Sequence, residues 1–489
     1  MSEPQLHRLH PSTILLEIVQ TIKNWSIPIV LLFVFARGSG EVPWWLWMGI
    51  FFTSIKLGVT TIRYITLRYG VVGDRLVIRT GIVFRQNRTI PVDRIQNLHL
   101  KSGLLHRVFR VVEVRVETAG TGEAEAHLSV ITQKRAEVFR SEVLQSRSDT
   151  AKAAEPAEDG VQVLRRARFK ELLLAGATEN RIGVLIAAIW GFYEFAGDLG
   201  ADDNQIAEQV ERSVSGTVMW PVAVAMLAGG FILCGWVASI LWTLITYHGF
   251  MLTRSGTDLR KRHGLLTRFE STIPIGRIQV LRLEASLLRR AFEALSIRVE
   301  TAGSKADEQQ GGTTLLCPLL SAYEAEDFCR YVYPDTDINS VVLEKLPLRA
   351  ARRKCIRVFL FGGCIATGCL IAGYTWPWWF LPGWAAFAVV VAWRHYRVVG
   401  YGLFGRFLYA RSGIITRKWW VVPQEKVQAV RVQQSPLQRW MNLATLHLAT
   451  AGGGSLSQVE VVDMTFDEAD RIFETLSRAA ARGGGREGL

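Results

Sequence analysis

The chain contains one sequence pattern three times, and this internal repeat limits the folds it can adopt more than any other feature. Three segments of 42 residues align without a gap: Arg79–Gly120, Arg262–Gly303 and Arg411–Gly452. The alignment extends back to Tyr64, Tyr247 and Tyr396, and thirteen of these 57 positions carry the same residue three times. Unrelated segments would share about one such position, so we expect three domains of one fold.

The shared residues predict strands and turns. In each copy Arg-x-Gly precedes two aliphatic residues, which is typical of a tight hairpin in which Gly81, Gly264 or Gly413 supplies positive φ. A proline then follows a β-branched pair and should end a strand. Alternating apolar residues, a Leu-rich turn, a strand ending in Thr-Ala-Gly and an amphipathic helix follow. Each copy therefore predicts about seven short antiparallel strands in a small β-sheet or barrel, closed by a C-terminal helix.

Long apolar segments separate the copies. A membrane-spanning helix needs about 20 largely apolar residues. Six segments approach this, in three pairs: 14–36 with 42–63, 181–198 with 217–246, and 355–373 with 376–396. Residues 14–24 carry Glu17, Gln20 and Lys23, so they either span the bilayer or lie on it as an amphipathic helix. The predicted fold class is a multi-domain membrane protein with six transmembrane helices in three pairs and three small β modules.

These segments and repeats predict a division of the chain into nine parts. In chain order they are transmembrane pair 1 (1–63), module 1 (64–145), a linker (146–180), transmembrane pair 2 (181–246), module 2 (247–335), a linker (336–354), transmembrane pair 3 (355–396), module 3 (397–480) and a disordered tail (481–489).

The charge distribution predicts orientation. The net charge is +13, and the basic residues cluster beside the apolar segments, whereas the loop at 197–217 is acidic. Because Lys and Arg gather on the cytoplasmic side of membrane proteins, we expect a multi-pass protein of the cell membrane with both termini and all modules in the cytoplasm.

No pattern of catalytic residues is present. The six cysteines form no CxxC pair, the nine histidines have no metal-ligand spacing, and no zinc-protease, nucleophile-elbow or phosphate-loop motif occurs. The sequence therefore predicts a protein that is not an enzyme and uses no cofactor or metal.

The repeat resembles the bacterial pleckstrin-homology (PH) domain of the YdbS/YdbT-like membrane proteins, and its threefold arrangement is similar to the YdbT-like members. The resemblance rests on the Arg-x-Gly hairpin, the Pro-x-x-Arg/Lys-aliphatic-Gln stretch at 91–96, 274–279 and 423–428, and the final Thr-Ala-Gly. It implies PH-like modules joined to membrane helices, with a role at the membrane or envelope and no defined ligand.

Nine arginines recur at three repeat positions and are the candidate contacts for a headgroup or partner: Arg79, Arg262 and Arg411 at the hairpin, Arg85, Arg268 and Arg417 beyond it, and Arg107, Arg290 and Arg439 in the Leu-rich turn. They either face anionic groups or bond strand-end carbonyls, Glu117 or Glu300 within the fold. The modules show no regular aromatic platform, so nucleic acid is not an expected partner.

Three functions fit this sequence. In the first, the protein is a membrane scaffold or adaptor whose modules bind proteins or one another. In the second, the modules bind anionic lipid. In the third, the helices form a transport or export path, with Lys56 and Glu194 as intramembrane charges, and the modules regulate it. The expected partners are the lipid bilayer, a protein or a second module, and anionic lipid.

Overall fold

The chain forms two compact units, and the boundary between them falls inside module 2. The computed structural model describes residues 6–16, 18–19, 23–25, 44–81, 85–92, 95–118, 126–139, 162–179, 219–302, 314–338, 340–373, 377–451 and 459–484. Unit 1 comprises Met1–Val116, Ala124–Gly256 and Arg260–Thr272, and unit 2 comprises Glu117–Glu123, Thr257–Leu259 and Ile273–Leu489. A compact unit is therefore not the same piece of chain as a sequence repeat.

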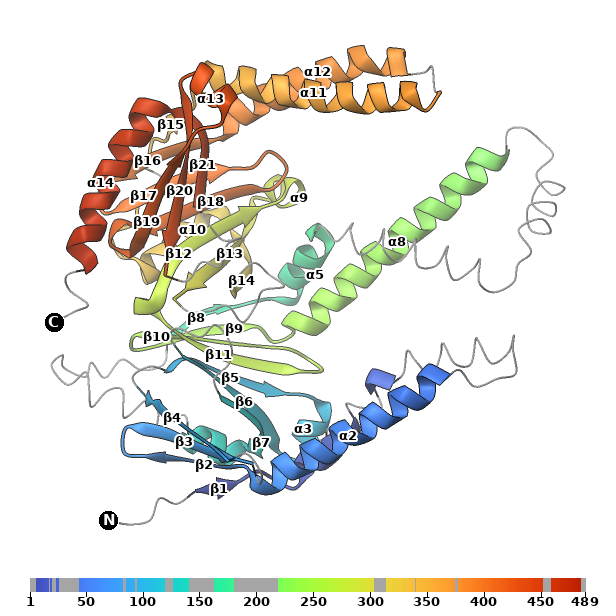
Figure 1. Cartoon of the computed structure of the whole chain (residues 1–489), viewed down its shortest axis with the longest axis vertical. Coiled ribbons are helices and arrows are strands. Elements are labelled where there is room, and N and C mark those ends of the chain that lie inside the picture. The colour runs from blue at the N-terminus through green and yellow to red at the C-terminus, as the bar shows by residue number, and fades with distance from the viewer. Residues whose placement is uncertain are drawn as a thin grey trace. The chain divides into compact units, whose positions relative to one another are not determined.

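Module 1 consists of two groups of antiparallel strands (Figure 1). Its elements and those leading into it are β1 (His7–Arg8), α2 (Trp44–Thr66), β2 (Arg68–Val72), β3 (Arg75–Thr80), β4 (Gln86–Pro91), β5 (Ile95–Ser102), α3 (Leu104–Val108), β6 (Val111–Thr118) and β7 (Ala126–Thr132). Gly73, with φ of 62°, forms the turn between β2 and β3, where a Cβ would be strained. The predicted strand end at Pro91 is confirmed.

The core of module 1 contains side chains from both groups of strands. Leu76 on β3 and Val114 on β6 have no exposed surface, and Phe139, from the helical segment 133–139, closes the cluster with 1% exposed. Burial of each such side chain contributes about 1.5–3 kcal/mol. This is the predicted arrangement of a small sheet structure closed by a helix.

Module 2 supplies strands to both units. In unit 1 its part and the segment before it contain β8 (Gln162–Arg166), α5 (Phe169–Thr178), α8 (Met219–Tyr247), β9 (Met251–Ser255) and most of β10 (Asp258–His263) and of β11 (Arg268–Pro274). In unit 2 it continues as η2 (Ile275–Arg277), β12 (Ile278–Ala285), α9 (Leu287–Ala291), β13 (Ala294–Thr301), β14 (Thr314–Ser321) and α10 (Ala322–Val332). The predicted linker 146–180 thus includes β8 and α5, because the buried face of α5, with Leu172 and Ala175, packs against α8.

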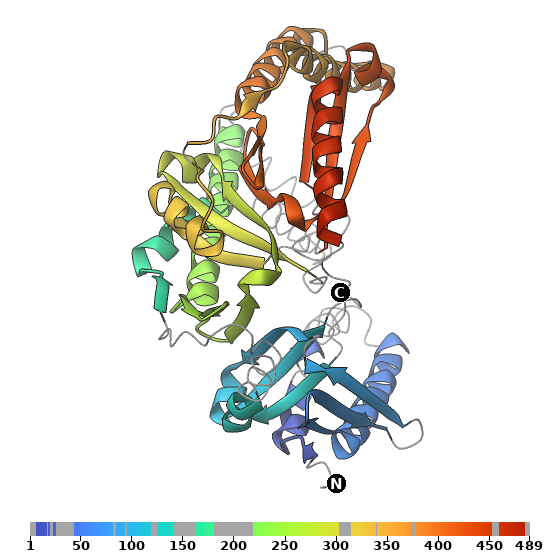
Figure 2. The same ribbon diagram turned by 90° about the vertical axis from the view of Figure 1, so that its left-hand side faces the viewer.

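Module 3 lies wholly in unit 2. Its elements and those leading into it are β15 (Glu344–Lys345), α11 (Leu348–Ile371), α12 (Pro377–Val398), β16 (Gly400–Phe404), β17 (Phe407–Ser412), β18 (Arg417–Pro423), η4 (Gln424–Lys426), β19 (Val427–Gln433), α13 (Pro436–Trp440), β20 (Leu443–Thr450), β21 (Val459–Thr465) and α14 (Phe466–Gly484). Helix α14 lies across the strands of this module (Figure 2). Its buried Ile472 and Leu476 join Tyr401 and Leu408 in one core.

The sheets run from one module into the next. The strand orders are β1-β2-β3-β4, β7-β6-β5-β11-β10-β9-β8, β14-β13-β12-β18-β17-β16-β15 and β19-β20-β21. The strands at the end of module 1 therefore continue into the first strands of module 2, and those at the end of module 2 continue into module 3.

The prediction of six transmembrane helices in three pairs is wrong. Within the described residues one helix, α11, is long and apolar enough to cross a bilayer, with a mean hydropathy of 1.7 over its best 18 residues. Helix α2 carries Lys56 and Arg63, the described apolar part of α8 is only Leu233–Tyr247, and α12 contains Pro382 and Arg394. The predicted span 181–198 and most of 14–36 lie outside the described residues.

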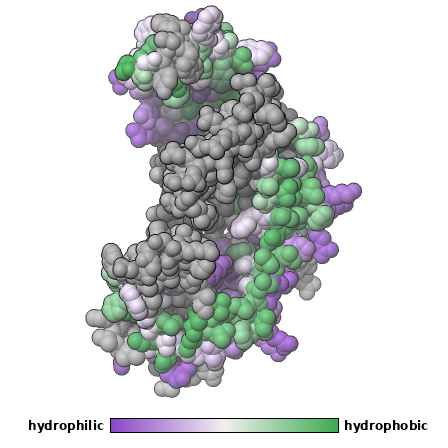
Figure 3. All heavy atoms as spheres, turned by 90° about the vertical axis from the view of Figure 1, so that its right-hand side faces the viewer, coloured by the Kyte–Doolittle hydropathy of each residue, from purple (hydrophilic) through white to green (hydrophobic). Residues whose placement is uncertain are grey.

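These helices nevertheless expose many large apolar side chains. Phe51 on α2, Trp242 on α8 and Phe361 on α11 are each about 60% exposed, and Trp379 on α12 is 90% exposed. The space-filling view of Figure 3 shows hydrophobic side chains that gather in bands at the surface. Exposed apolar patches of this kind mark contact with a membrane or a partner.

A buried ion pair fastens α11 to module 3. Arg353 Nη1 donates to Asp463 Oδ1 on β21, with side chains 9% and 3% exposed. Gln438 Nε2 donates to the same oxygen at 2.9 Å. Module 1 has apolar residues at the matching positions. Leu16 follows β1 at the distance at which Arg353 follows β15, and Val130 lies two residues before the end of β7, as Asp463 does in β21. Leu16 and Val130 belong to one hydrophobic cluster.

Candidate functional site

The most regular site in the structure is the joint at which one module continues into the next. In the first joint β5 pairs antiparallel with β11, and Ser102 lies opposite Arg268. In the second, β12 pairs with β18, and Ala285 lies opposite Arg417. Ser102 and Ala285 share one repeat position, and Arg268 and Arg417 share another. The two joints therefore have the same register.

An arginine from the Leu-rich turn crosses each joint. Arg107, on α3, donates through Nη2 to the carbonyl oxygens of Leu265 and Leu266 at 2.6 and 2.9 Å. Arg290, on α9, donates in the same way to the carbonyl oxygens of Ile414 and Ile415 at 3.1 and 3.3 Å. A guanidinium bonded to two carbonyls is a charge-assisted contact that also fixes orientation.

The accepting carbonyls belong to the predicted Arg-x-Gly hairpins. Gly264 and Gly413 have φ of 113° and 91°, which confirms the predicted positive values. A Cβ at either glycine would lie 1.9 Å from the carbonyl oxygen of Thr267 or Thr416. Glycine therefore permits the tight turn to which the neighbouring module bonds.

Each joint encloses a hollow lined by residues at the same repeat positions. The first has a volume of about 250 Å³ and is lined by Leu100, Arg107 and Arg268, among others. The second, of about 540 Å³, is lined by Leu283, Arg290 and Arg417. Burial, followed by the charges of Arg262 and Arg107, lowers the pKa of Arg268, and burial with Arg290 and Arg394 lowers that of Arg417. Arginine charges thus lie close together in each hollow, with Glu137 and Glu270 in the lining of the first and Glu284 and Glu293 in that of the second.

The structure brings some of the nine candidate arginines together and leaves others apart. Arg107, Arg262 and Arg268 line the first hollow, and Arg290 and Arg417 line the second. Arg411 instead donates to the Val398 carbonyl at 2.6 Å and lies 5.0 Å from the Trp419 ring. The remaining three, Arg79, Arg85 and Arg439, are exposed and separate from these hollows.

Glu300 forms no hydrogen bond with these arginines. Its side chain on β13 is fully buried, and within the described residues neither carboxylate oxygen has a hydrogen-bond partner. Burial raises the pKa of this carboxyl to about 7, against the opposing charge of Arg282. The side chain of Glu117 lies outside the described residues.

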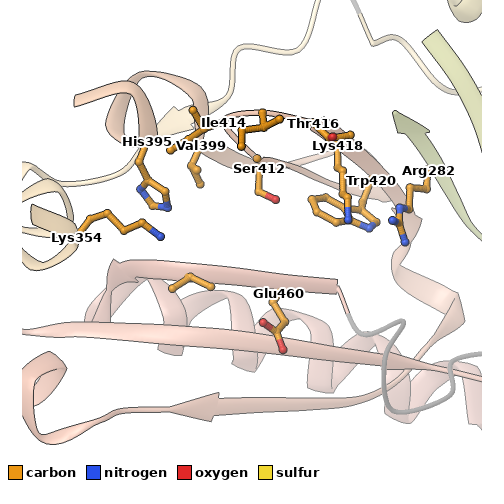
Figure 4. A pocket seen from close by; sticks show the side chains of 13 residues that line it. Arg282, Lys354, His395, Val399, Ser412, Ile414, Thr416, Lys418, Trp420 and Glu460 are labelled. Carbon is orange, nitrogen blue, oxygen red and sulfur yellow. The ribbon is translucent and has the colours of Figure 1, made fainter. Parts of the chain in front are cut away.

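A second candidate site is a hollow of about 700 Å³ within unit 2 that sequence reasoning missed (Figure 4). Lys354 of α11 and His395 of α12 point toward it from one end, and Lys418 of β18 and Arg282 of β12 lie at the other. Burial and the charge of Arg282 lower the pKa of Lys418. Glu460 is the acidic residue in its lining, so the hollow has a positive balance.

No sequence signal marks this second site, because Lys418 does not recur in the repeats and His395 lies outside the aligned segment. Lys418 corresponds to Gln86 and Phe269 in the other copies, and His395 stands just before the first aligned position. Among the described residues, the His395 Nδ1 atom is buried without a hydrogen-bond partner. No three His, Cys, Asp or Glu side chains meet as a metal site anywhere in the described ranges.

Comparison with known proteins identifies relatives of the whole chain. The Bacterial PH domain family matches three times, at residues 19–147, 213–336 and 356–480. The transmembrane protein YdbT of Bacillus subtilis (strain 168) is 25% identical over 518 aligned residues, which cover 99% of this chain and 100% of that protein. No solved structure matches the chain.

Proposed function

This chain belongs to the Bacterial PH domain family as a membrane-associated, YdbT-like protein, and from that premise we propose that it is a scaffold whose modules bind one another through shared sheets. The observation that carries the proposal is the repeated joint. The same strand register and the same arginine contact occur between modules 1 and 2 and again between modules 2 and 3. A module surface used twice in one way is a binding surface for another module.

The joint also supports a common side of the membrane for modules 2 and 3. Helices α11 and α12 lie in the chain between β12 and β18, yet these two strands pair. Trp384 of α12 donates to the Val358 carbonyl of α11 at 2.8 Å, so α12 returns alongside α11. Because Arg349, Arg352 and Arg357 cluster in the first half of α11, we place this side and both termini in the cytoplasm.

The joint is tested by hydrogen exchange on the full chain in lipid nanodiscs. Arg290→Ala should weaken the second joint by about 1.5–3 kcal/mol, the usual contribution of a hydrogen bond to a charged group. We expect backbone amides of β18 to exchange about tenfold faster or more, while those of β20 keep their protection. Arg289→Ala is the matched control, because Arg289 bonds Ser296 inside module 2 at 2.9 Å. Unchanged exchange in β18 would refute the role of the joint.

One observation favours anionic-lipid binding as a second candidate function. The 700 Å³ hollow has Lys354 and His395 at one end and Lys418 and Arg282 at the other. Among the described residues the His395 Nδ1 atom has no hydrogen-bond partner, and the hollow lies beside the basic first turns of α11. Such a site suits a phosphate-bearing headgroup. Lys418→Gln should reduce retention of phosphatidylglycerol by the purified full chain, whereas Lys345→Gln, on the exposed β15, should not. Equal retention by both variants would remove this candidate.

The transport alternative has no such support. Lys56 lies on α2, and Glu194, the other predicted intramembrane charge, lies outside the described residues.

A further inference from the structure

Modules 1 and 3 each have one strand of the joint type that pairs with no other module among the described residues. In the described part of the structure β4 is the outer strand of its sheet, and β19 is the outer strand of its own. By repeat position β4 corresponds to β11 and β18, while β19 corresponds to β5 and β12. The two strand types that pair twice within the chain are therefore each present once more, at an edge.

The free edges expose positions that the joints cover. Gln279 and Leu281 of β12 are 4% and 0% exposed. Their counterparts on β19 are Gln428, which is exposed, and Val430, which is half-buried. On β4, residues 86–89 are all exposed, whereas their counterparts in β18 are half-buried or buried. An unpaired strand edge is a template for another strand, and neither edge contains an internal proline that would block pairing.

We propose that β19 of one copy of this protein pairs antiparallel with β4 of a second copy, in the register of the two internal joints. This inference rests on the proposed scaffold function. The register places Val430 opposite Thr89 and Gln434 opposite Arg85. Arg439, exposed on α13, takes the place that Arg107 and Arg290 have in the internal joints. Because the two surfaces differ, the contact is head-to-tail and can continue from copy to copy.

The occupant is a second copy because both matching halves occur in this chain and continue an interface that it already uses. The register also places Arg431 of β19 directly opposite Arg88 of β4. Like charges in that position oppose pairing, and opposite charges favour it. The contact should therefore be weak in the native protein and easily strengthened, as suits an assembly that forms only at high density in the membrane.

The first experiment uses charge reversal in the full chain, labelled with two fluorophores and reconstituted into phosphatidylcholine vesicles at varied density. Arg431→Glu alone and Arg88→Glu alone should each tighten self-association by about two- to fivefold, and the double variant should return close to native. Arg439→Ala should weaken it by about tenfold. Arg478→Glu, on the exposed face of α14, is the control and should leave it unchanged. Single reversals that fail to tighten association would overturn the proposal.

A second experiment identifies the partner copy. One chain carries Thr89→Cys and a first tag, and a second chain carries Val430→Cys and a different tag. When the two chains are co-expressed, a disulfide should link them. Each variant expressed alone controls for the six native cysteines. A link formed only within one chain that carries both cysteines would overturn the second-copy assignment. Faster β18 exchange in the Arg290→Ala variant, together with no association between copies, would reject this inference and leave the scaffold proposal standing.

Discussion

Replacing Glu300 by Gln should stabilise unit 2 at neutral and alkaline pH. Glu300 is fully buried on β13, and its carboxylate oxygens have no hydrogen-bond partner among the described residues. An ionised carboxylate in such a place lacks both water and a compensating donor. Glutamine keeps the size of the side chain and removes the charge.

The size and sign of the effect follow from the pKa of Glu300. Burial raises it from 4.5 to about 7 in the folded protein. Between these values the folded state binds more protons than the unfolded state, so stability falls as the pH rises. The loss is complete above about pH 7 and amounts to about 3 kcal/mol, because each pKa unit corresponds to about 1.4 kcal/mol. Below pH 4.5 the carboxyl is neutral in both states and this penalty is absent.

The assay measures the unfolding of the full chain in detergent micelles at pH 5, 6, 7 and 8. Hydrogen exchange of the β13 backbone amides reports the unfolding. Glu300→Gln should remove most of the loss between pH 5 and 8 and slow the exchange of β13 at pH 8. Glu474→Gln is the control, because Glu474 lies on the exposed face of α14. If the native protein and the Glu300→Gln variant showed the same pH dependence, the assignment of a buried, unpartnered carboxyl would be wrong.

Two further predictions concern other buried polar groups. Asp463→Ala should destabilise module 3 by about 3–5 kcal/mol in thermal unfolding, because it leaves Arg353 buried without its carboxylate. Arg353→Met combined with Asp463→Asn should cost less, because no charge is left buried, asparagine tolerates the φ of 66° at this position and its amide oxygen can still accept from Gln438. Burial is the chief cause that lowers the pKa of His263 to about 4, so unit 1 should lose stability as the pH falls from 6.5 to 4. His263→Gln should remove this loss, measured as the pH dependence of hydrogen exchange in β10.

The sequence predicted the modules well because their strands depend on local patterns. The φ values of Gly264 and Gly413 and the strand ends at Pro274 and Pro423 follow from steric rules that act within a few residues. It could not predict that β5 would pair with β11. A repeat shows that strands are alike, but not which copy of a strand a given strand will pair with.

The sequence predicted too many membrane-spanning helices and missed the second hollow, for different reasons. Hydropathy windows count apolar residues but do not decide whether a segment such as α12, with Pro382 and Arg394, spans a bilayer alone or packs beside α11. Lys354 and Lys418 line the same hollow only because α11 packs against module 3. No periodicity in the sequence connects them.

The boundary between Thr272 and Ile273 has a practical and an evolutionary consequence. The repeated sequence segment and the compact structural unit begin and end at different residues. Excising the middle copy would remove one strand from each joint and leave β5 and β18, which are matching halves, to form a new joint, whereas a cut at either repeat border would separate strands that pair. Loss or gain of one full repeat length would therefore keep the two joint strands in step, whereas a change of any other length would not.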